Sequence, residues 1–224
     1  MGGHWSQEAK RMARDSDGGD QFGDSVAIAG QTVLVGAPEQ DDPHGPESGA
    51  AYVYTRAGGD WKRAAKLVPA DGDEDDLFGN AVALSGETAL IGASSEEAAN
   101  GVNAGAAYVF TRSRGTWTQR AKLAADDGNG GDLFGYAVAL DDGLVLVGAA
   151  FDEAPNGLQA GSAYVFSGSG PSWTQRGKLL AEDGDGGDFF GSSVALSDET
   201  VIIGAAADED PNGFEAGAAY IYRP

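Results

Sequence analysis

The sequence predicts an all-β protein made of four equal units, arranged as the blades of a β-propeller. Tryptophan recurs every 56 residues, at positions 5, 61, 117 and 173, and the chain of 224 residues is four times that period. A phenylalanine-glycine pair keeps the same spacing and occurs at Phe22-Gly23, Phe78-Gly79, Phe134-Gly135 and Phe190-Gly191. Repeats longer than about 40 residues that are rich in short strands are typical of propeller blades.

Each unit is predicted to contain four short strands, and the pattern is clearest in the second unit. There we expect strands at 78–84, 89–92, 106–111 and 117–123, because apolar and polar residues alternate between clusters of glycine and acidic residues. The fourth strand carries Arg120 and Lys122 on one face. Charge on that face favours an outer position, because it discourages edge-to-edge association. No segment sustains the period of an amphipathic helix.

The two ends of the chain predict how the ring closes. The chain begins with a fourth strand (5–13) and ends with a third strand (218–222). Six residues separate Tyr54 from Trp61, and six also lead from Tyr222 through both termini to Trp5. We therefore expect the N-terminal outer strand to pair with the C-terminal blade within one domain, 1–224, because open ends would leave unpaired strands. The expected blades span about 20–70, 76–126, 132–182, and 188–224 together with 4–13. Two chains sharing an eight-bladed ring are the alternative, so the protein is expected to be a monomer or a homodimer.

Composition excludes several classes of partner. The net charge of −21 makes nucleic acids and anionic membranes poor partners on electrostatic grounds. Cysteine is absent, which excludes disulfides and cysteine-ligated zinc. The sequence contains no run of about 18 apolar residues, so membrane insertion is not expected. Lysine is scarce and aspartate abundant, a pattern typical of halophilic proteins. The start, Met1-Gly2-Gly3-His4, lacks the apolar stretch of a signal peptide, and we expect any export signal to lie outside this sequence.

Three repeated strings carry a family resemblance. In the fourth unit they are Phe190-Gly191, Gly204-Ala205 and the run 216–222, and the first unit contains Gly36-Ala37-Pro38. This pattern resembles the FG-GAP repeat, which builds the seven-bladed head of integrin alpha chains and occurs in secreted or surface proteins of bacteria and archaea. The resemblance implies a non-enzymatic, extracellular or cell-surface interaction and adhesion module with an unidentified protein or glycan ligand.

Two departures from the integrin pattern affect what the resemblance implies. There are four units here and not seven. Integrin-like calcium loops lie between the first and second strands of a blade, where this chain has only short connections such as Ala29-Gly30-Gln31. These connections are too short to surround an ion that needs six to eight oxygen ligands. The family's usual calcium site is therefore not expected.

The acidic residues concentrate in two classes of loop. The connections from fourth to first strands and from second to third strands hold 27 of the 35 acidic residues. In an up-and-down blade both classes emerge on one side of the disc, so one face is predicted to be strongly negative and to bind the ligand. Candidate ligand-face residues in the second-to-third loops are Glu39, Asp41, Asp42, Glu96, Glu97, Asp152, Glu153, Asp208, Glu209 and Asp210.

The loops between blades suggest a calcium site of another kind. They repeat an approximate Asp-x-Asp-x-x-Asp in a glycine-rich setting, and alternating carboxylates supply the hard oxygens that calcium needs. The candidate ligands are Asp15, Asp17, Asp20, Asp71, Asp73, Asp76, Asp127, Asn129, Asp132, Asp183, Asp185 and Asp188. The alternative is that the last Asp accepts backbone N–H groups in a turn while the others are solvated.

No catalytic constellation stands out in the sequence. His4 and His44 are not at equivalent positions, and no nucleophile elbow or phosphate loop is present. Carboxylates are numerous, but nothing singles out an acid and a base. We therefore expect a non-enzymatic module. The alternative is a salt-adapted structural scaffold without a dedicated ligand.

Overall fold

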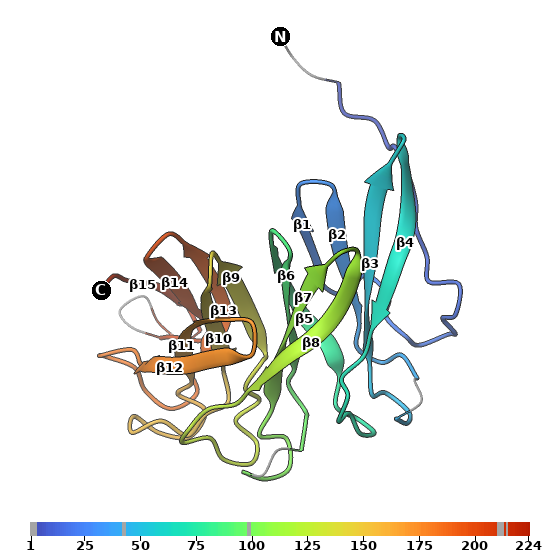
Figure 1. The fold of residues 1–224 in the computed structure, drawn as a ribbon. Coiled ribbons are helices and arrows are strands. Elements are labelled where there is room, and N and C mark those ends of the chain that lie inside the picture. Colours follow the sequence, from blue (N-terminus) through green and yellow to red (C-terminus); the bar gives the residue numbers. More distant parts are fainter. Residues whose placement is uncertain (1–3, 42–43, 98–99, 210–212, 214) are drawn as a thin grey trace.

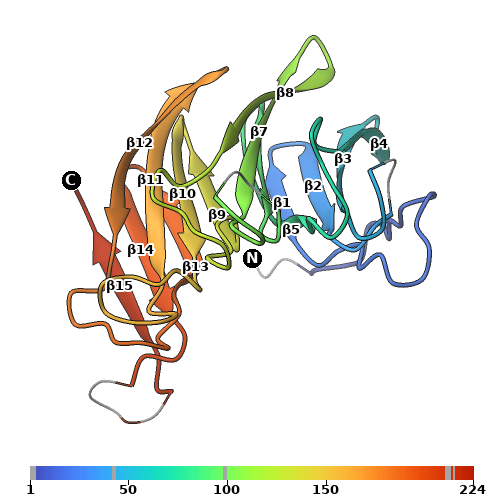
Figure 2. The same cartoon turned by 90° about the horizontal axis from the view of Figure 1, so that it is seen from below.

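The structure is a computed structural model that describes residues 4–41, 44–97, 100–209, 213 and 215–224. The described residues form fifteen strands and no helix. The strands assemble into four separate antiparallel sheets, one for each sequence unit, which stand side by side in a row (Figures 1 and 2). The predicted all-β architecture of four repeated sheets is confirmed.

Within each sheet the strands follow one another in chain order. The first sheet contains β1 (Val26–Ala29), β2 (Thr32–Ala37), β3 (Ala50–Ala57) and β4 (Asp60–Leu67). The second contains β5 (Phe78–Ser85), β6 (Thr88–Ala93), β7 (Ala106–Ser113) and β8 (Thr116–Leu123). The third contains β9 (Ala137–Asp141), β10 (Leu144–Ala149), β11 (Ser162–Ser169) and β12 (Ser172–Leu179). The fourth has three strands, β13 (Phe190–Ser197), β14 (Thr200–Ala205) and β15 (Ala218–Tyr222).

The connections fall into two classes that lie at opposite ends of the sheets. Short hairpins join first to second strands and third to fourth strands. The longer loops, from second to third strands and from each sheet to the next, emerge at the other end (Figure 1). The two acid-rich loop classes therefore share one side of the row, the loop face.

The repeated Phe-Gly and Gly-Ala strings meet where neighbouring sheets pack. Phe78 is fully buried, and its ring lies edge-on to Tyr108 with centroids 5.5 Å apart. A Cβ atom added to Gly36 would lie 2.0 Å from the carbonyl oxygen of Gly79 in the next unit. The two further junctions repeat this contact, at 2.1 Å for Gly92 with Gly135 and 2.0 Å for Gly148 with Gly191. Only glycine permits this approach, so the motif fixes one geometry for all three junctions.

The predicted closure of the ring within one chain is not formed in this structure. Residues 4–13 form no strand and run beside the first sheet, where the Tyr54 hydroxyl donates to the Met12 carbonyl at 3.3 Å and Glu8 pairs with Arg56 at 2.5 Å. The fourth sheet stands at the far end of the row, and β15 is its edge strand (Figures 1 and 2). The same glycine contact recurs at all three junctions, and the first and last sheets stand at opposite ends of the row (Figures 1 and 2).

Candidate functional site

The acidic residues of the loops between second and third strands separate into exposed and buried positions. Asp41, Glu97, Glu153 and Glu209 occupy one repeated position and are exposed on the loop face. Glu39 is half-buried, whereas Asp42 and Asp210 lie outside the described residues. The exposed set is a candidate surface for a positively charged ligand.

The neighbouring repeated position corrects part of the sequence prediction. Glu96, Asp152 and Asp208 are 4%, 2% and 4% exposed, so they do not offer carboxylates to a ligand at the surface. Gln40 takes the same position in the first unit and is also buried. In the second and third units the fourth strand brings a lysine to the buried carboxylate.

The third unit shows this lysine contact most completely. The Lys178 ammonium lies 2.7 Å from Asp152 and 2.8 Å from Asp127, and the Tyr164 hydroxyl oxygen lies within hydrogen-bond distance, 3.0 Å, of both carboxylates. The Ser162 hydroxyl adds a hydrogen bond of 2.5 Å to Asp152. In the second unit Lys122 pairs with Glu96 and, at 2.9 Å, with Asp71. In the first unit Lys66 lies 3.5 Å from Asp15. In the second and third units the lysine therefore ties two loops to the end of a fourth strand, and in the first unit it contacts one loop.

Ion pairing and burial move the pKa values of this cluster away from neutral pH. Burial lowers the pKa of Lys178, but its hydrogen bonds to Asp127 and Asp152 outweigh burial and raise the pKa overall. Burial also raises the pKa of Tyr164 above its ordinary value. A general base needs a pKa near the working pH, and both shifts move away from it. The cluster therefore acts as a tether between loops and strand.

The Asp-x-Asp-x-x-Asp loops form the same turn in every unit. The last carboxylate accepts the backbone N–H of the residue three positions earlier. The N···O distances are 2.8 Å for Asp17 to Asp20, 2.7 Å for Asp73 to Asp76, 2.7 Å for Asn129 to Asp132 and 2.6 Å for Asp185 to Asp188. The accepting side chains are buried, and the residues in the middle position are exposed. Turn formation by the last Asp, the alternative stated above, is confirmed.

These contacts do not fit a calcium cage. The first carboxylate pairs with a cation of the protein in three units, as Asp15 does with Arg63, Asp71 with Lys122 and Asp127 with Lys178. The last carboxylate uses one of its oxygens to accept a backbone N–H. Across the described part of the chain, no three His, Cys, Asp or Glu side chains are grouped to hold a metal ion. Calcium binding by these residues stays a prediction to be tested.

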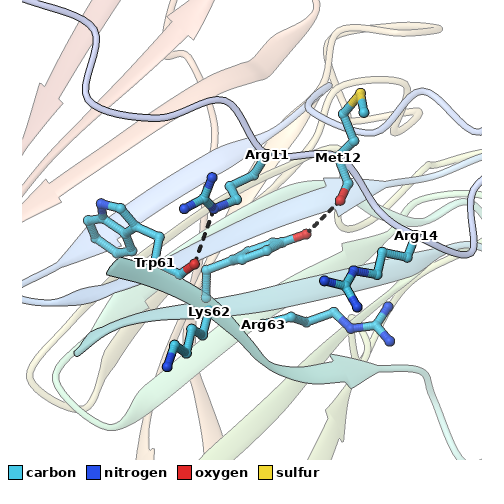
Figure 3. Close-up of a pocket in the computed structure, with 7 residues that line it drawn as sticks. Arg11, Met12, Arg14, Trp61, Lys62 and Arg63 are labelled. Carbon is cyan, nitrogen blue, oxygen red and sulfur yellow. Dashed lines mark hydrogen bonds between the residues drawn. The ribbon is translucent and has the colours of Figure 1, made fainter. Parts of the chain in front are cut away.

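Two hollows bear on the sequence prediction: the first is lined by candidate residues of both acidic loop classes, and the second has no counterpart in the prediction. One of about 1000 Å³ opens on the loop face of the third unit and is lined by Asp132, Glu153, Leu158 and the Lys178 cluster. Another of about 580 Å³ lies on the outer side of the first sheet, against the N-terminal segment (Figure 3). Arg11, Met12, Arg14, Tyr54, Trp61, Lys62 and Arg63 line it, and the Arg11 Nε donates to the Trp61 carbonyl at 3.2 Å. The sequence signal available for the second hollow was the cluster of basic residues on a first-unit fourth strand.

Sequence comparison places these features in a known family. The family described as FG-GAP repeat matches residues 5–54, 61–110, 117–166 and 173–222. The chain belongs to the FG-GAP repeat family. Each match begins at a tryptophan and ends in a third strand, so a family unit joins the fourth strand of one sheet to the three strands that follow.

Individual relatives are more distant. Integrin alpha-6 of Gallus gallus is 30% identical over 128 residues, which covers 53% of this FG-GAP chain and 12% of that protein. The solved structure of Saccharomyces cerevisiae Sqt1 superposes on 84% of this chain and 43% of its own with a TM-score of 0.47 and 11% identity. A yeast complex containing Dbp5, Nup159 and Gle1 gives a TM-score of 0.44 at 10% identity over 88% of this chain and 43% of the matched one. Within the described residues, no helix is long and apolar enough to cross a membrane.

Proposed function

We propose that this FG-GAP chain is a non-catalytic interaction and adhesion module of an extracellular or cell-surface protein, and that it binds a positively charged protein segment on its loop face. The observation that carries the proposal is the exposed acidic residue at one repeated loop position in all four units, Asp41, Glu97, Glu153 and Glu209. Family membership and the similarity to an integrin alpha chain support an interaction role.

Charge supports a cationic ligand over a neutral one. With a net charge of −21 the protein attracts cationic segments over long range, which raises association rates and disfavours acidic partners. The buried carboxylates are already paired with lysines in the second and third units. The exposed positions therefore supply the charge that a partner would meet. The same lysine pairing supports the absence of catalysis, because the polar cluster repeats between units and is held in ion pairs.

The test compares two triple variants with the same change of charge. One neutralises the loop face (Glu97→Gln, Glu153→Gln, Glu209→Gln), and the control neutralises the hairpin side (Asp60→Asn, Asp142→Asn, Glu199→Gln), where all three residues are exposed. The probe is a short arginine-rich peptide, with affinity measured by calorimetry at fixed ionic strength. We expect the loop-face variant to bind about tenfold more weakly, which corresponds to about 1.4 kcal/mol, and the control to bind as the parent does.

Two results would contradict the proposal. Equal weakening by both triple variants means that the peptide senses net charge alone, and the salt-adapted scaffold then explains the acid better. Binding of a neutral polysaccharide without binding of the peptide would assign the loop face to a glycan.

A further inference from the structure

The free face of the fourth sheet exposes apolar residues that the other sheets bury. Ile202 is 40% exposed and Ile221 is 67% exposed. The residues aligned with Ile202, one period apart, are Leu34, Leu90 and Leu146, and all are fully buried. Val53 and Val109 align with Ile221 and are also fully buried. The fourth sheet therefore carries one half of a junction whose other half is not in contact with it.

The opposite end of the row exposes the other half. Val26 and Ile28 of β1 are 68% and 67% exposed, whereas the aligned Val82 and Leu84 are partly buried and pack against the core between the first and second sheets. A Cβ atom added to Gly23 would meet nothing within 4 Å. A Cβ atom added to the aligned Gly79 would lie 2.5 Å from the carbonyl oxygen of Ala50 in the preceding unit. The two ends of the row thus expose the residues that form opposite halves of each internal junction.

A cavity marks the place of the strand that the fourth sheet lacks. It measures about 400 Å³ and lies between the third and fourth sheets, beside β15. Val165, Leu179, Val201 and Tyr222 are among its lining residues. At the preceding junction the aligned residues, Val109, Leu123, Val145 and Phe166, form a core against which Trp173 packs. One period after Trp173, counted through the two termini, comes Trp5. Trp5 would therefore take the place of Trp173 at this cavity, but it is 97% exposed.

Charge complementarity gives a separate argument for the same strand. In the first three sheets the fourth-strand lysine pairs in register with a third-strand tyrosine, as Tyr164 does with Lys178 and Tyr108 with Lys122. In the fourth sheet the Tyr220 hydroxyl oxygen lies 3.0 Å from Asp183 and 2.5 Å from Asp208, as that of Tyr164 lies beside Asp127 and Asp152. Residues 4–13 paired with β15 in the same register would bring Lys10 to Tyr220 and these carboxylates.

The strand must come from another chain if the junction geometry is kept. All three junctions have the same glycine contact, and three such steps leave the first and fourth sheets at opposite ends of an open row (Figures 1 and 2). We propose that residues 4–13 of one copy add to β15 of a second copy, that Trp5 fills the cavity there, and that the reciprocal exchange closes a two-chain ring of eight sheets. Head-to-tail contacts of this kind form closed rings when the rotation permits.

The first test is the mass of the assembly. Sedimentation or light scattering should give twice the chain mass of 22.8 kDa at high sodium chloride, where repulsion between the acidic copies is screened. Trp5→Ala should raise the dissociation constant of the assembly at least tenfold. Because Trp5 is exposed in the single chain, this change does not remove a core residue from it. Ser6→Ala is the matched control, since the aligned Thr118 and Thr174 are exposed, and it should leave the mass unchanged.

Cross-linking distinguishes the second copy from the same chain. The protein has no cysteine, so Ala9→Cys and Ile221→Cys can be made in separate proteins and mixed. The aligned pairs Val53 with Ala65 and Val109 with Ala121 are register partners, so a disulfide between the two proteins is expected. A single-chain mass with Trp5 shielded from quenchers would mean that the chain closes on itself, and a single-chain mass with Trp5 accessible would remove strand addition altogether. Polymers that grow with concentration would refute the closed ring.

Discussion

Replacing Lys178 with methionine tests whether the lysine tether stabilises the fold. Lys178 pairs with Asp152, whose side chain is 2% exposed, and with Asp127, whose side chain is 53% exposed. The exposed partner contributes little because water solvates it in either case. The buried partner would be left as a carboxylate without its cation, and removing one member of a buried ion pair typically costs about 3–5 kcal/mol.

The first unit supplies a matched comparison. Lys66 lies 3.5 Å from Asp15, which is 40% exposed, and the buried acid of the loop is replaced there by Gln40. Lys66→Met should therefore lower the free energy of unfolding by less than about 1 kcal/mol. Lys178→Met should lower it by about 3 kcal/mol, which for a protein of this size corresponds to a fall in melting temperature of about 6–12 °C.

The assay is urea denaturation followed by tryptophan fluorescence, with melting curves as a second reading. Adding Asp152→Asn to Lys178→Met should recover most of the loss, because a neutral amide can be buried beside Tyr164 and Ser162 without a cation. Equal losses for Lys178→Met and Lys66→Met would refute the reasoning. So would a double variant as unstable as the single one, since the cost would then come from lost packing and not from a stranded charge.

Further predictions concern pH, packing and calcium. Burial raises the pKa of Asp76 to about 6, so the folded state holds a proton that the unfolded state releases, and the contribution of Asp76 to stability falls as the pH rises from about 4 to 6. The free energy of unfolding of Asp76→Asn minus that of the parent should therefore be about 1–3 kcal/mol larger at pH 7 than at pH 4, as measured by denaturation. The same difference at both pH values would contradict this. Gly92→Ala, whose Cβ would lie 2.1 Å from a backbone oxygen, should cost at least about 1–3 kcal/mol, whereas Gly177→Ala, with open space around it, should be neutral or stabilising. At matched ionic strength calcium and sodium chloride should raise the melting temperature equally, because the first carboxylate of the loop pairs with a cation of the protein in three units and the last accepts a backbone N–H; a calcium-specific rise would establish ion sites in the Asp-x-Asp-x-x-Asp loops.

Much of the fold follows from periodic features that local sequence carries. Alternating residues predicted strands at 106–111 and 117–123. The structure has these strands slightly longer, at Ala106–Ser113 and Thr116–Leu123. The 56-residue period transferred each assignment to the other units; Phe78, Phe134 and Phe190 are buried, whereas Phe22 in the first unit is half-buried. Because successive strands run up and down, the strand order alone predicted that both acidic loop classes lie on one side.

Local sequence could not predict which acidic residues of the loops are buried and which are exposed. Glu96 and Glu97 are neighbours of the same type, yet Glu96 faces Lys122, which lies 26 residues further along the chain. Only the packing of a fourth strand under the loop decides which carboxylate is buried. A signal was present, because Lys66, Lys122 and Lys178 recur at one position while the exposed charges of these strands vary. The N-terminal segment shows a second limit. Residues 4–13 have the sequence of a strand, but a strand requires a partner edge, and the junctions between sheets decide where that edge lies.

Salt separates the two proposed interactions of this FG-GAP chain. The exposed acids of the loop face attract a cationic ligand, so raising ionic strength should weaken that binding. The same charges repel a second copy, whereas the contacts proposed between copies are mainly apolar: Trp5 in its cavity, and Ile202 and Ile221 against the first sheet. Raising ionic strength should therefore strengthen assembly while it weakens ligand binding. If both increased together with salt, the ligand would not be held by the exposed carboxylates. If both decreased, charge pairs such as Lys10 with Asp183 would dominate the contact between copies, and the apolar cavity would not be the main contributor.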